Sequence, residues 1–296
     1  MFPPRSILAG VDFSEQSRGA LMLAALIARR CGARLHVVYA EEPRLAEAAA
    51  RGGVDLAAEC RTELARFAGA TPGVAACAPE QLVNVGRPAT VLLHAACRMR
   101  ADLTVLGARG MSGAGRFLFG SVAESVLLQS AGSVLVVPDW WASLAPALEC
   151  DDRLGPLVVG IDFSEPSVLA LHAAIALAGP LQAGVEAVHV VPDLAAPEAW
   201  KRHAEEVVAA QVAAARADLT RLVAQITSPV HVSTRVERGG VVEQLIEAAM
   251  PLGDRNPLLV VGRRGTRSKA GIPGAIAYRL ASMTRVPVLM HRELAD

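Results

Sequence analysis

The stretch Ala9–Ser17, AGVDFSEQS, returns 150 residues later as Val159–Ser167, VGIDFSEPS. In both copies a short apolar run leads into an aspartate and a serine, a pattern typical of a strand that gives way to a helix. A repeat of this kind indicates the architecture before any single motif is considered. The sequence therefore predicts two copies of one structural unit.

Four further segments repeat in the same order at nearly constant offset. The chain of 296 residues is about twice the usual ~150-residue domain, which agrees with a tandem duplication. We expect domains at residues 1–140 and 156–296, with the boundary in the tryptophan-bearing stretch Asp139–Pro156. The matched segments are LHVVY (Leu35–Tyr39) with VHVVP (Val188–Pro192) at 153, Gly86 with Gly239 at 153, LTVLGARG (Leu103–Gly110) with LLVVGRRG (Leu258–Gly265) at 155, and SVLVVP (Ser133–Pro138) with PVLM (Pro287–Met290) at 154.

Short β-branched runs alternate with longer amphipathic or Ala-rich runs in each half, which predicts a mostly parallel sheet with helices on both faces. The fold class expected is α/β, with two tandem doubly wound units of the Rossmann-like or flavodoxin-like kind. In the first half the expected strands are Ser6–Val11, Arg34–Ala40, Ala75–Val85, Leu103–Gly107 and Ser133–Val137. The expected helices are Ser14–Arg30, Glu42–Gly69, Pro88–Met99 and Ser121–Gln129.

Composition excludes several classes of protein. Hydrophobic residues make up 52% of the chain and charged residues 20%, which is too apolar for a disordered chain. Lys plus Arg equals Asp plus Glu, 29 each, and aromatic residues are only 4%, so no nucleic-acid partner is expected. The five cysteines form no CxxC pair and the seven histidines no HExxH motif, which indicates reduced thiols and no zinc site.

Two segments bear on where in the cell the protein is expected, the amino terminus and Pro166–Val185. The amino terminus has no signal-type apolar core, because Asp12 and Glu15 come too early. Pro166–Val185 has no charged residue over 20 positions, but its prolines and glycines favour a buried helix of about three turns followed by a turn. We therefore expect a cytoplasmic protein with no membrane partner.

In doubly wound sheets, ligands bind beyond the carboxyl ends of the strands. The loops leaving the first and fourth expected strands begin at Asp12 and Gly107. The second loop, Gly107–Ser121, reads GARGMSGAGRFLFGS: glycine, two residues, glycine, nine residues, glycine and serine. Backbone amides without side chains can surround phosphate oxygens, and Ser121 opens a helix whose amino end favours anions. This pattern predicts a phosphate site in the first half.

Both halves resemble universal stress protein domains. The resemblance rests on the order of VDFSE after the first strand, HVV in the second, VGRPA before the third helix, the glycine-serine loop, and SVLVVP in the last strand. It covers essentially the whole chain. Members of this family either bind ATP or do not, and the glycine-serine loop marks the first kind. The resemblance therefore implies an ATP-binding domain in the first half and a regulatory role in the stress response.

The resemblance also implies the contacts of an adenine nucleotide in the first half. Asp12 would contact the ribose or an associated Mg²⁺, and Val37 would meet the adenine edge through its backbone. Arg109 and Arg116 offer charge that the resemblance does not strictly assign. The residues that line the same loop or surround the phosphates are Val11, Phe13, Ser14, Gly107, Gly110, Gly120, Ser121 and Val122.

Structural roles are alternatives for several of these residues. Ser121 with Glu124 forms an S-x-x-E pattern, which is typical of a capping box, although capping does not explain the three glycines of the loop. Asp12 could merely close the turn before the first helix, since Asp162 recurs in the other half. Val37 is also explained as a buried strand residue.

The second half departs from the pattern at the phosphate loop. Its loop, Gly262–Ala277, reads GRRGTRSKAGIPGAIA, with eight residues in place of nine and Ala275 where a serine is expected. The lost hydroxyl removes a helix cap of about 1 kcal/mol, while Arg263, Arg264, Arg267 and Lys269 could compensate by charge. A structural pseudo-domain is favoured over a weaker second nucleotide site. The residues of that second site would be Asp162, Phe163, Ser164, Val190, Gly262, Gly265 and Gly274.

Binding is expected in preference to turnover. The chain has no GxxxxGK[ST] loop to organise phosphates for hydrolysis and no GxSxG elbow. The loop after the first strand also differs from the SGGxDS-like loop of adenylating ATP pyrophosphatases. A slow ATPase and a nucleotide-independent interaction scaffold are the alternatives.

The last expected strand of each half is a candidate for pairing between domains. In the family, domains often pair through these strands, so the resemblance implies that Ser133–Pro138 and Pro287–Met290 pair within the chain as an internal dimer. Such pairing would cover two exposed sheet edges. A homodimer and an unidentified protein partner are further expectations.

Overall fold

The computed structural model describes residues 2–109, 120–144, 154–250, 256–263 and 275–293. In the first half of the chain the strands are β1 (Ser6–Val11), β2 (Arg34–Glu41), β3 (Glu80–Val85), β4 (Leu103–Gly107) and β5 (Ser133–Val137). The helices of this half are α1 (Glu15–Cys31), α2 (Pro43–Arg51), α3 (Leu56–Gly69), α4 (Pro88–Arg98) and α5 (Ser121–Gln129), with short 3-10 turns at Ala75–Cys77 and Asp139–Leu144.

The second half repeats this order of elements. Its strands are β6 (Leu157–Gly160), β7 (Val185–Val191), β8 (Val232–Arg238), β9 (Leu258–Gly262) and β10 (Val288–His291). Its helices are α7 (Glu165–Leu181), α8 (Lys201–Ala224), α9 (Val241–Ala248) and α10 (Ala275–Met283), with a 3-10 turn at Glu198–Trp200.

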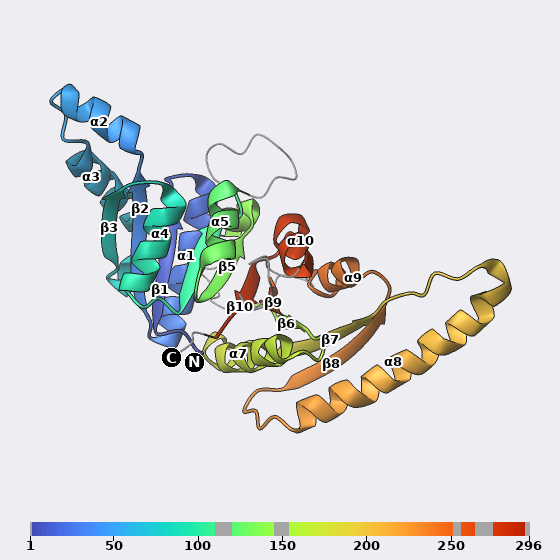
Figure 1. Cartoon of the computed structure of the whole chain (residues 1–296). Helices are drawn as coiled ribbons and strands as arrows, with labels where there is room; N and C mark the ends of the chain where they lie inside the picture. The colour runs from blue at the N-terminus through green and yellow to red at the C-terminus, as the bar shows by residue number, and fades with distance from the viewer. Residues whose placement is uncertain (1, 110–119, 145–153, 251–255, 264–274, 294–296) are drawn as a thin grey trace.

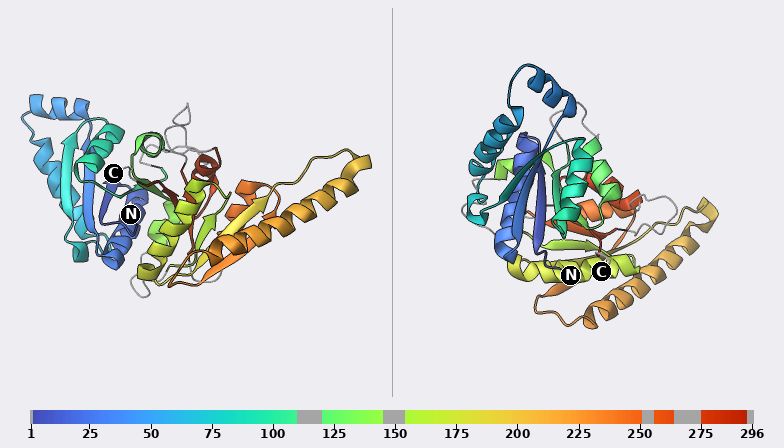
Figure 2. Two further views of the ribbon diagram at one scale, coloured as in Figure 1. Left: turned by 60° about the horizontal axis from the view of Figure 1, so that its bottom comes forward. Right: turned by 60° about the vertical axis from the view of Figure 1, so that its left-hand side comes forward.

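In the described part of the chain, all ten strands form one sheet in the order β3-β2-β1-β4-β5-β10-β9-β6-β7-β8. Helices cover both faces of this sheet (Figures 1 and 2). Within each half, neighbouring strands are parallel. The expected doubly wound α/β architecture, used twice, is confirmed.

The two halves meet at the centre of the sheet, where β5 and β10 pair antiparallel. Leu135 lies opposite Leu289, and Val136 lies opposite Val288. The expected pairing of the last strands within one chain is therefore confirmed. Neither strand is left as an edge, because the pairing turns two five-stranded sheets into one.

The hydrophobic core also runs across both halves. On one face α1 packs against α7, and Leu23 and Leu171 belong to the same buried cluster. On the other face Leu127 of α5 and Leu280 of α10 share a second cluster. All four side chains are fully buried. Burial of apolar surface on both faces therefore stabilises the junction of the halves.

Three expected elements differ from those observed. The single helix expected over residues 42–69 is broken into α2 and α3, because Gly53 takes a φ of 73° and Asp55 caps a new helix through Ala58 N at 3.0 Å. The strand expected from Ala75 starts only at Glu80, after a 3-10 turn. Helix α7 runs over 17 residues with Pro180 in its last turn, longer than the three turns expected.

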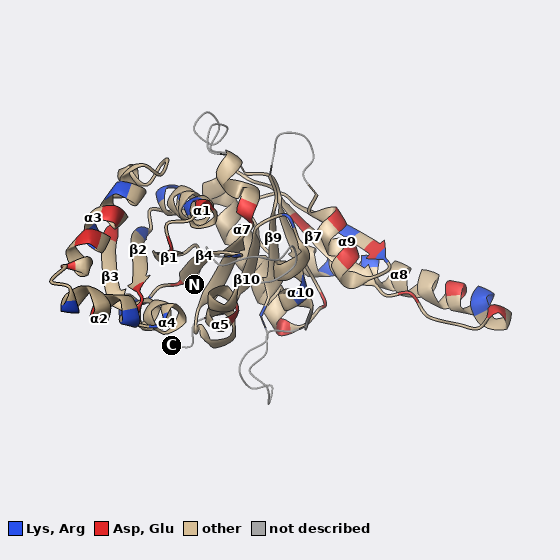
Figure 3. Cartoon of the chain, turned by 90° about the horizontal axis from the view of Figure 1, so that it is seen from above, with Lys and Arg blue, Asp and Glu red and all other residues tan. Residues whose placement is uncertain are grey.

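Helix α8 projects from the body of the molecule (Figure 1), and charges of both signs lie along it (Figure 3). Arg202 is 3.5 Å from Glu206, and Arg221 is 3.0 Å from Asp218. Such exposed pairs contribute well under about 1 kcal/mol each. No helix in the described residues is long and apolar enough to span a membrane.

Candidate functional site

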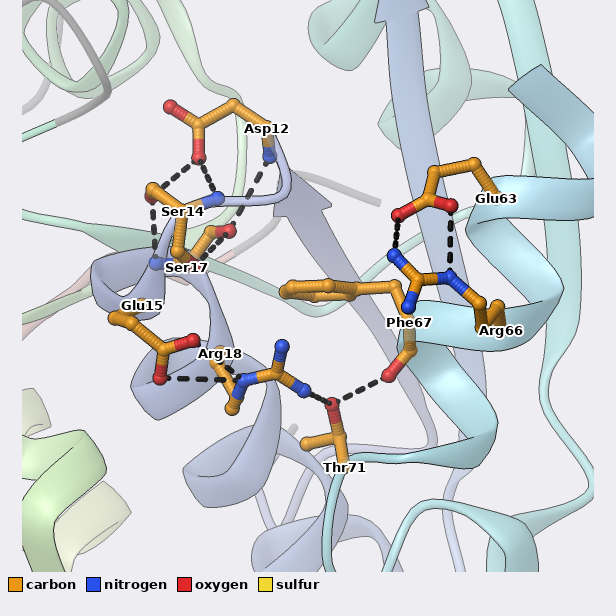
Figure 4. Close-up of polar contacts among 9 residues, drawn as sticks. All are labelled: Asp12, Ser14, Glu15, Ser17, Arg18, Glu63, Arg66, Phe67 and Thr71. Atoms are coloured by element: carbon orange, nitrogen blue, oxygen red, sulfur yellow. Dashed lines mark hydrogen bonds and ion pairs between the residues drawn. The ribbon is translucent and has the colours of Figure 1, made fainter. Parts of the chain in front are cut away.

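The loop between β1 and α1 is organised around Asp12 (Figure 4). The backbone N–H and the hydroxyl of Ser14 both donate to Asp12 Oδ1, the N–H at 3.1 Å. Ser14 Oγ in turn accepts from Ser17 N at 3.2 Å and so caps α1. The peptide N–H of Asp12 donates to Ser17 Oγ at 3.3 Å. The DFSE sequence therefore folds into a closed turn that fixes the position of the carboxylate.

The same turn occurs in the second half. Ser164 donates to Asp162 Oδ1 from its N–H at 3.0 Å and from its hydroxyl, and Asp162 N donates to Ser167 Oγ at 3.3 Å. The residue between them is left-handed in both halves, with a φ of 65° at Phe13 and 60° at Phe163. A positive φ is rare for an aromatic residue. The turn-closing role that was an alternative for Asp12 is therefore present in both copies.

Phe13 packs on aromatic residues of β2 and α3. Its ring packs on Tyr39 at a centroid distance of 4.4 Å and on Phe67 at 5.6 Å. Arg18 lies over the Phe67 ring at 4.4 Å and donates to Thr71 Oγ1 at 3.2 Å (Figure 4). Phe13 thus belongs to the packing of α1 against α3, and its predicted contact with a nucleotide stays a prediction.

The glycines that end β4 and β9 lie close to neighbouring backbone. A Cβ on Gly107 would lie 3.1 Å from the carbonyl oxygen of Arg109 and 3.3 Å from the backbone of Gln16 in α1. A Cβ on Gly262 would lie only 2.4 Å from the carbonyl oxygen of Pro166 in α7. In both halves the strand end is pressed against the first turn of a helix. This contact brings the first turn of the helix that follows the aspartate turn against the strand end at which the glycine loop begins.

Helix α5 begins at Ser121, and the capping box considered as an alternative role for Ser121 and Glu124 is not formed. Gly120 is the N-cap and donates from its N–H to the carbonyl oxygen of Ala108 at 2.9 Å. Ser121 is the first helical residue and is exposed, and the helix has no side-chain cap. Glu124 Oε1 instead accepts from the Tyr278 hydroxyl at 3.2 Å. The amino end of α5 therefore keeps its anion-attracting N–H groups.

Two arginines that follow the strand-end glycines, Arg109 and Arg263, are bonded to other residues of the same chain. Arg109 Nη2 lies 2.5 Å from Asp139 Oδ2. Arg263 is 4% exposed and donates to the carbonyl oxygens of Ser130 at 2.6 Å and Gly132 at 3.3 Å. Arg263 therefore serves the junction of the halves. The suggestion that the basic residues of this loop compensate by charge for the lost serine stays a prediction.

Some of the predicted residues are not placed by the structure. The positions concerned lie outside the described residues, so their roles stay predictions: Gly110, Arg116, Arg264, Gly265, Arg267, Lys269 and Gly274. Val11 is buried at the end of β1, and Val122 is half-buried in the first turn of α5.

A cavity of about 430 Å³ lies in the second half, beyond the carboxyl ends of β6, β7 and β9. Asp162 and Ser164 of the turn line it together with Val190, Gly262 and Ala277. Four of the residues predicted for a second site are thus brought together, while Phe163 packs on His189 at a ring distance of 4.8 Å. The cavity is within the usual size range of ligand sites, roughly 300–1,000 Å³.

The register of the sheet corrects the alignment of the second strands. Gly10 pairs with Val38 and Gly160 pairs with Val188, so these strands match at an offset of 150 and the offset of 153 is wrong. The error arises because HVV occurs in both strands at positions three residues apart, and apolar strand sequences tolerate such shifts. The offset set by the DFSE repeat simply continues through α1 and β2.

This correction changes which first-half residues correspond to the lining of the second-half cavity. Val37 is fully buried in the cluster under α1, and its true counterpart is Ala187 in the same cluster. Val190, which lines the cavity, corresponds to Ala40. Val38 and Ala40 are therefore the first-half counterparts of the cavity-lining Val188 and Val190, a correspondence that sequence reasoning missed. The backbone contact implied for Val37 stays a prediction.

The described residues hold no group of three His, Cys, Asp or Glu side chains that could together bind a metal ion. Mg²⁺ commonly uses one or two carboxylates together with nucleotide phosphates, so the single carboxylate of Asp12 fits an ion that arrives with the nucleotide. Of the described cysteines, Cys31, Cys60 and Cys77 have pKa values raised by burial, that of Cys31 to about 11. These thiols are free and stay protonated at neutral pH.

The fold and the repeated loops define a tandem α/β protein with a candidate ligand site at the carboxyl ends of the strands in each half. The model of the universal stress protein family matches residues 4–138 and again residues 154–292. The chain therefore belongs to the universal stress protein family and carries two of its domains.

Relatives support the same conclusion over the whole chain. A universal stress protein of Mycolicibacterium smegmatis is 30% identical over 308 residues, which cover 97% of this chain and 96% of that protein. A shorter Thermus aquaticus universal stress protein is 31% identical over 140 residues, 45% of this chain and 98% of that protein. The crystal structure of a universal stress protein from Archaeoglobus fulgidus matches with a TM-score of 0.64 at 19% identity, over 98% of this chain and 99% of that one, and shows the same fold.

Proposed function

We propose that this universal stress protein binds an adenine nucleotide, ATP in particular, as a regulatory ligand, mainly in its first half. The observation that carries the proposal is the cavity of the second half, where the aspartate turn, the end of the second strand, the strand-end glycine and the start of the last helix meet. The first half repeats these elements and adds the glycine-serine loop.

The amino end of α5 supplies the chemistry for phosphate. Its N–H groups have no side-chain cap, and Ser121 stands exposed at the first helical position. Gly120 approaches Ala108 and Arg109 closely, since a Cβ there would lie 3.2 Å from the Ala108 carbonyl oxygen. Helix N-termini with glycine in the preceding loop are favourable anion sites. These features support phosphate binding next to Gly107.

Asp12 is proposed to act on the ribose or on a phosphate-bound Mg²⁺. The Ser14 N–H and hydroxyl hold its Oδ1 in place, so the carboxylate is oriented before a ligand arrives. Preorganisation of this kind lowers the cost of ordering on binding. The magnesium ion would supply charge neutralisation between the carboxylate and the phosphates.

The second half is proposed as a weaker site. It has the aspartate turn and a formed cavity, but Ala275 stands where the first half has Ser121, and Arg263 is committed to the junction of the halves. Its affinity for phosphate would therefore rest on backbone amides and on the remaining basic residues of its loop.

The proposal is tested by equilibrium dialysis of the full chain with ATP. Ser121→Ala removes one hydroxyl that would bond a charged phosphate, so the dissociation constant is expected to rise about 10- to 100-fold. Ser125→Ala, on the same helix, is the matched control and should bind as the wild type does. Absence of measurable ATP binding at millimolar concentration would support the interaction scaffold instead. Turnover above about 1 s⁻¹ would make the protein an enzyme.

A further inference from the structure

Arg263 connects the cavity of the second half to the first half. It follows directly on Gly262, which lines the cavity, and its own N–H donates to the carbonyl oxygen of His291 at 2.9 Å. Its guanidinium reaches across the junction to the carbonyl oxygens of Ser130 and Gly132. The residue next to the cavity-lining Gly262 is therefore hydrogen-bonded to the first half through a buried charged group.

Arg263 donates to the carboxyl end of α5. Ser130 is the C-cap of this helix, and an arginine near a helix carboxyl terminus satisfies carbonyl groups that have no partner within the helix. The other end of α5 carries Gly120 and Ser121, beside the proposed phosphate site of the first half. One helix of nine residues, about 14 Å long, thus joins Arg263 to that site.

A second bond links the same elements. Helix α10 lines the cavity with Ile276 and Ala277, and the next residue, Tyr278, donates its hydroxyl to Glu124 of α5 at 3.2 Å. Figure 1 shows α5 and α10 as neighbours on one face of the sheet. Two walls of the cavity therefore each carry, one residue away, a donor that contacts α5.

A third set of contacts connects the strand end of the first half to the second half. We call these contacts, together with the hydrogen bonds of Arg263 and Tyr278 to α5, the ties between the halves. Arg109, two residues after Gly107, pairs with Asp139. The following residue, Trp140, donates its indole N–H to the carbonyl oxygen of Arg285 in the second half at 2.6 Å, just beyond the end of α10. The strand-end segment of each half is thus tied to the end of the last helix of the other half.

We propose that the two candidate sites are energetically coupled through these ties, so that occupancy of the second-half cavity changes the affinity of the first half for nucleotide. The inference rests on the proposed function. A ligand that shifts Gly262 or Ala277 must carry Arg263 and Tyr278 with it or break their bonds to α5, because these donors are adjacent in sequence. By linkage, nucleotide in the first half changes the affinity of the cavity by the same factor.

The coupling is tested with a substitution that fills the second-half cavity with a large side chain. Val241 lines the cavity and is half-buried at the start of α9, so Val241→Trp places an indole there while the first half is untouched. ATP binding to the full chain is measured by calorimetry, and the first-half site is identified as the one weakened by Ser121→Ala. Coupling predicts at least about a fivefold change in its dissociation constant in V241W.

The same comparison is then made with the ties weakened. Tyr278→Phe keeps the ring and removes the donor, and Arg263→Lys keeps the charge and shortens the reach. In the background of both changes the effect of V241W should fall below about twofold. Arg279→Gln is the matched control, because Arg279 neighbours Tyr278 but pairs with Glu243 within the second half at 3.1 Å, and it should leave the effect of V241W intact.

The outcomes separate the two proposals. If no variant and no wild-type chain binds ATP, the proposed function fails and the coupling with it. If ATP binds at the Ser121 site with the same affinity in wild type and V241W, only the coupling fails. A V241W effect that persists after both ties are weakened also overturns the assignment to Arg263 and Tyr278.

Discussion

Arg263 of the second half donates from Nη2 to the carbonyl oxygen of Ser130 in the first half, at 2.6 Å. The guanidinium is buried at the junction, and burial together with the nearby charge of Arg292 lowers its pKa to about 10. The guanidinium therefore remains charged at neutral pH, and it donates hydrogen bonds to backbone carbonyl groups. The junction of the halves is thus polar as well as apolar.

We expect Arg263→Met to destabilise the protein. The methionine fills part of the space but removes two hydrogen bonds from a charged donor, at a cost of about 1–3 kcal/mol. The two carbonyl oxygens keep weaker contacts, Ser130 O with Arg292 Nη1 at 3.2 Å and Gly132 O with Ser130 Oγ at 3.1 Å. Urea unfolding of the full chain measures the change. Arg279→Met, which removes an exposed pair with Glu243, should stay within about 0.5 kcal/mol of wild type. Equal stability of the two variants would show that the Arg263 bonds contribute nothing net.

His291 predicts a loss of stability in acid. It is 7% exposed, and burial lowers its pKa from 6.5 to about 4. Its Nδ1 lies 3.0 Å from Ser133 Oγ, and Asp102, Arg292 and Glu293 line the small cavity beside it. Between pH 6.5 and 4 the unfolded chain binds a proton here that the folded chain does not, so stability falls as the pH falls through this window.

The size of the His291 effect follows from the same shift. A full shift of this kind is worth about 3 kcal/mol, lost progressively on acidification. Urea unfolding at pH 7, 6, 5 and 4 measures the slope, and His291→Gln should flatten it. His94→Gln, on the exposed face of α4, is the control. An unchanged slope in H291Q would contradict the assignment to His291.

Gly262→Ala should destabilise the second half. The new Cβ would lie 2.4 Å from the Pro166 carbonyl oxygen and 2.8 Å from Ser167 N, so β9 and α7 must move apart. Overpacking against backbone costs about 1–3 kcal/mol. Gly184→Ala is the control, because a Cβ there meets nothing within 4 Å. Thermal unfolding compares the two, and equal melting temperatures would argue against the close contact.

The sequence predicted the sheet well for physical reasons. β1, β4 and β5 have the predicted bounds, because each is a short apolar run buried on both faces and closed by turn residues. The pairing of the two last strands was expected from the family resemblance. Its antiparallel direction and its register, with Leu135 opposite Leu289, are known from the structure alone.

Three other features depend on tertiary contacts and could not be predicted from the sequence: the break at Gly53, the register of β2, and the partners of Arg263. Gly53 breaks a helix whose flanks are both helix-forming, and only its positive φ reveals the break. The offset error at Val37 arose because neighbouring valines on a strand are interchangeable until the register is known. Arg263 looked like a phosphate ligand beside other basic residues, but its partners lie more than 100 residues away in the chain. Long-range hydrogen bonds leave no local pattern.

We propose that the first half holds the principal nucleotide site. Calorimetric titration of the full chain with ATP and Mg²⁺ tests it most directly when Asp12→Asn is compared with Asp162→Asn. Each amide keeps the oxygen that accepts from Ser14 or Ser164, so both turns can persist while one charge is lost. We predict that D12N weakens the tight site at least about tenfold, in line with loss of a charged contact, and that D162N changes it far less. Equal weakening, or a larger effect of D162N, would contradict the account.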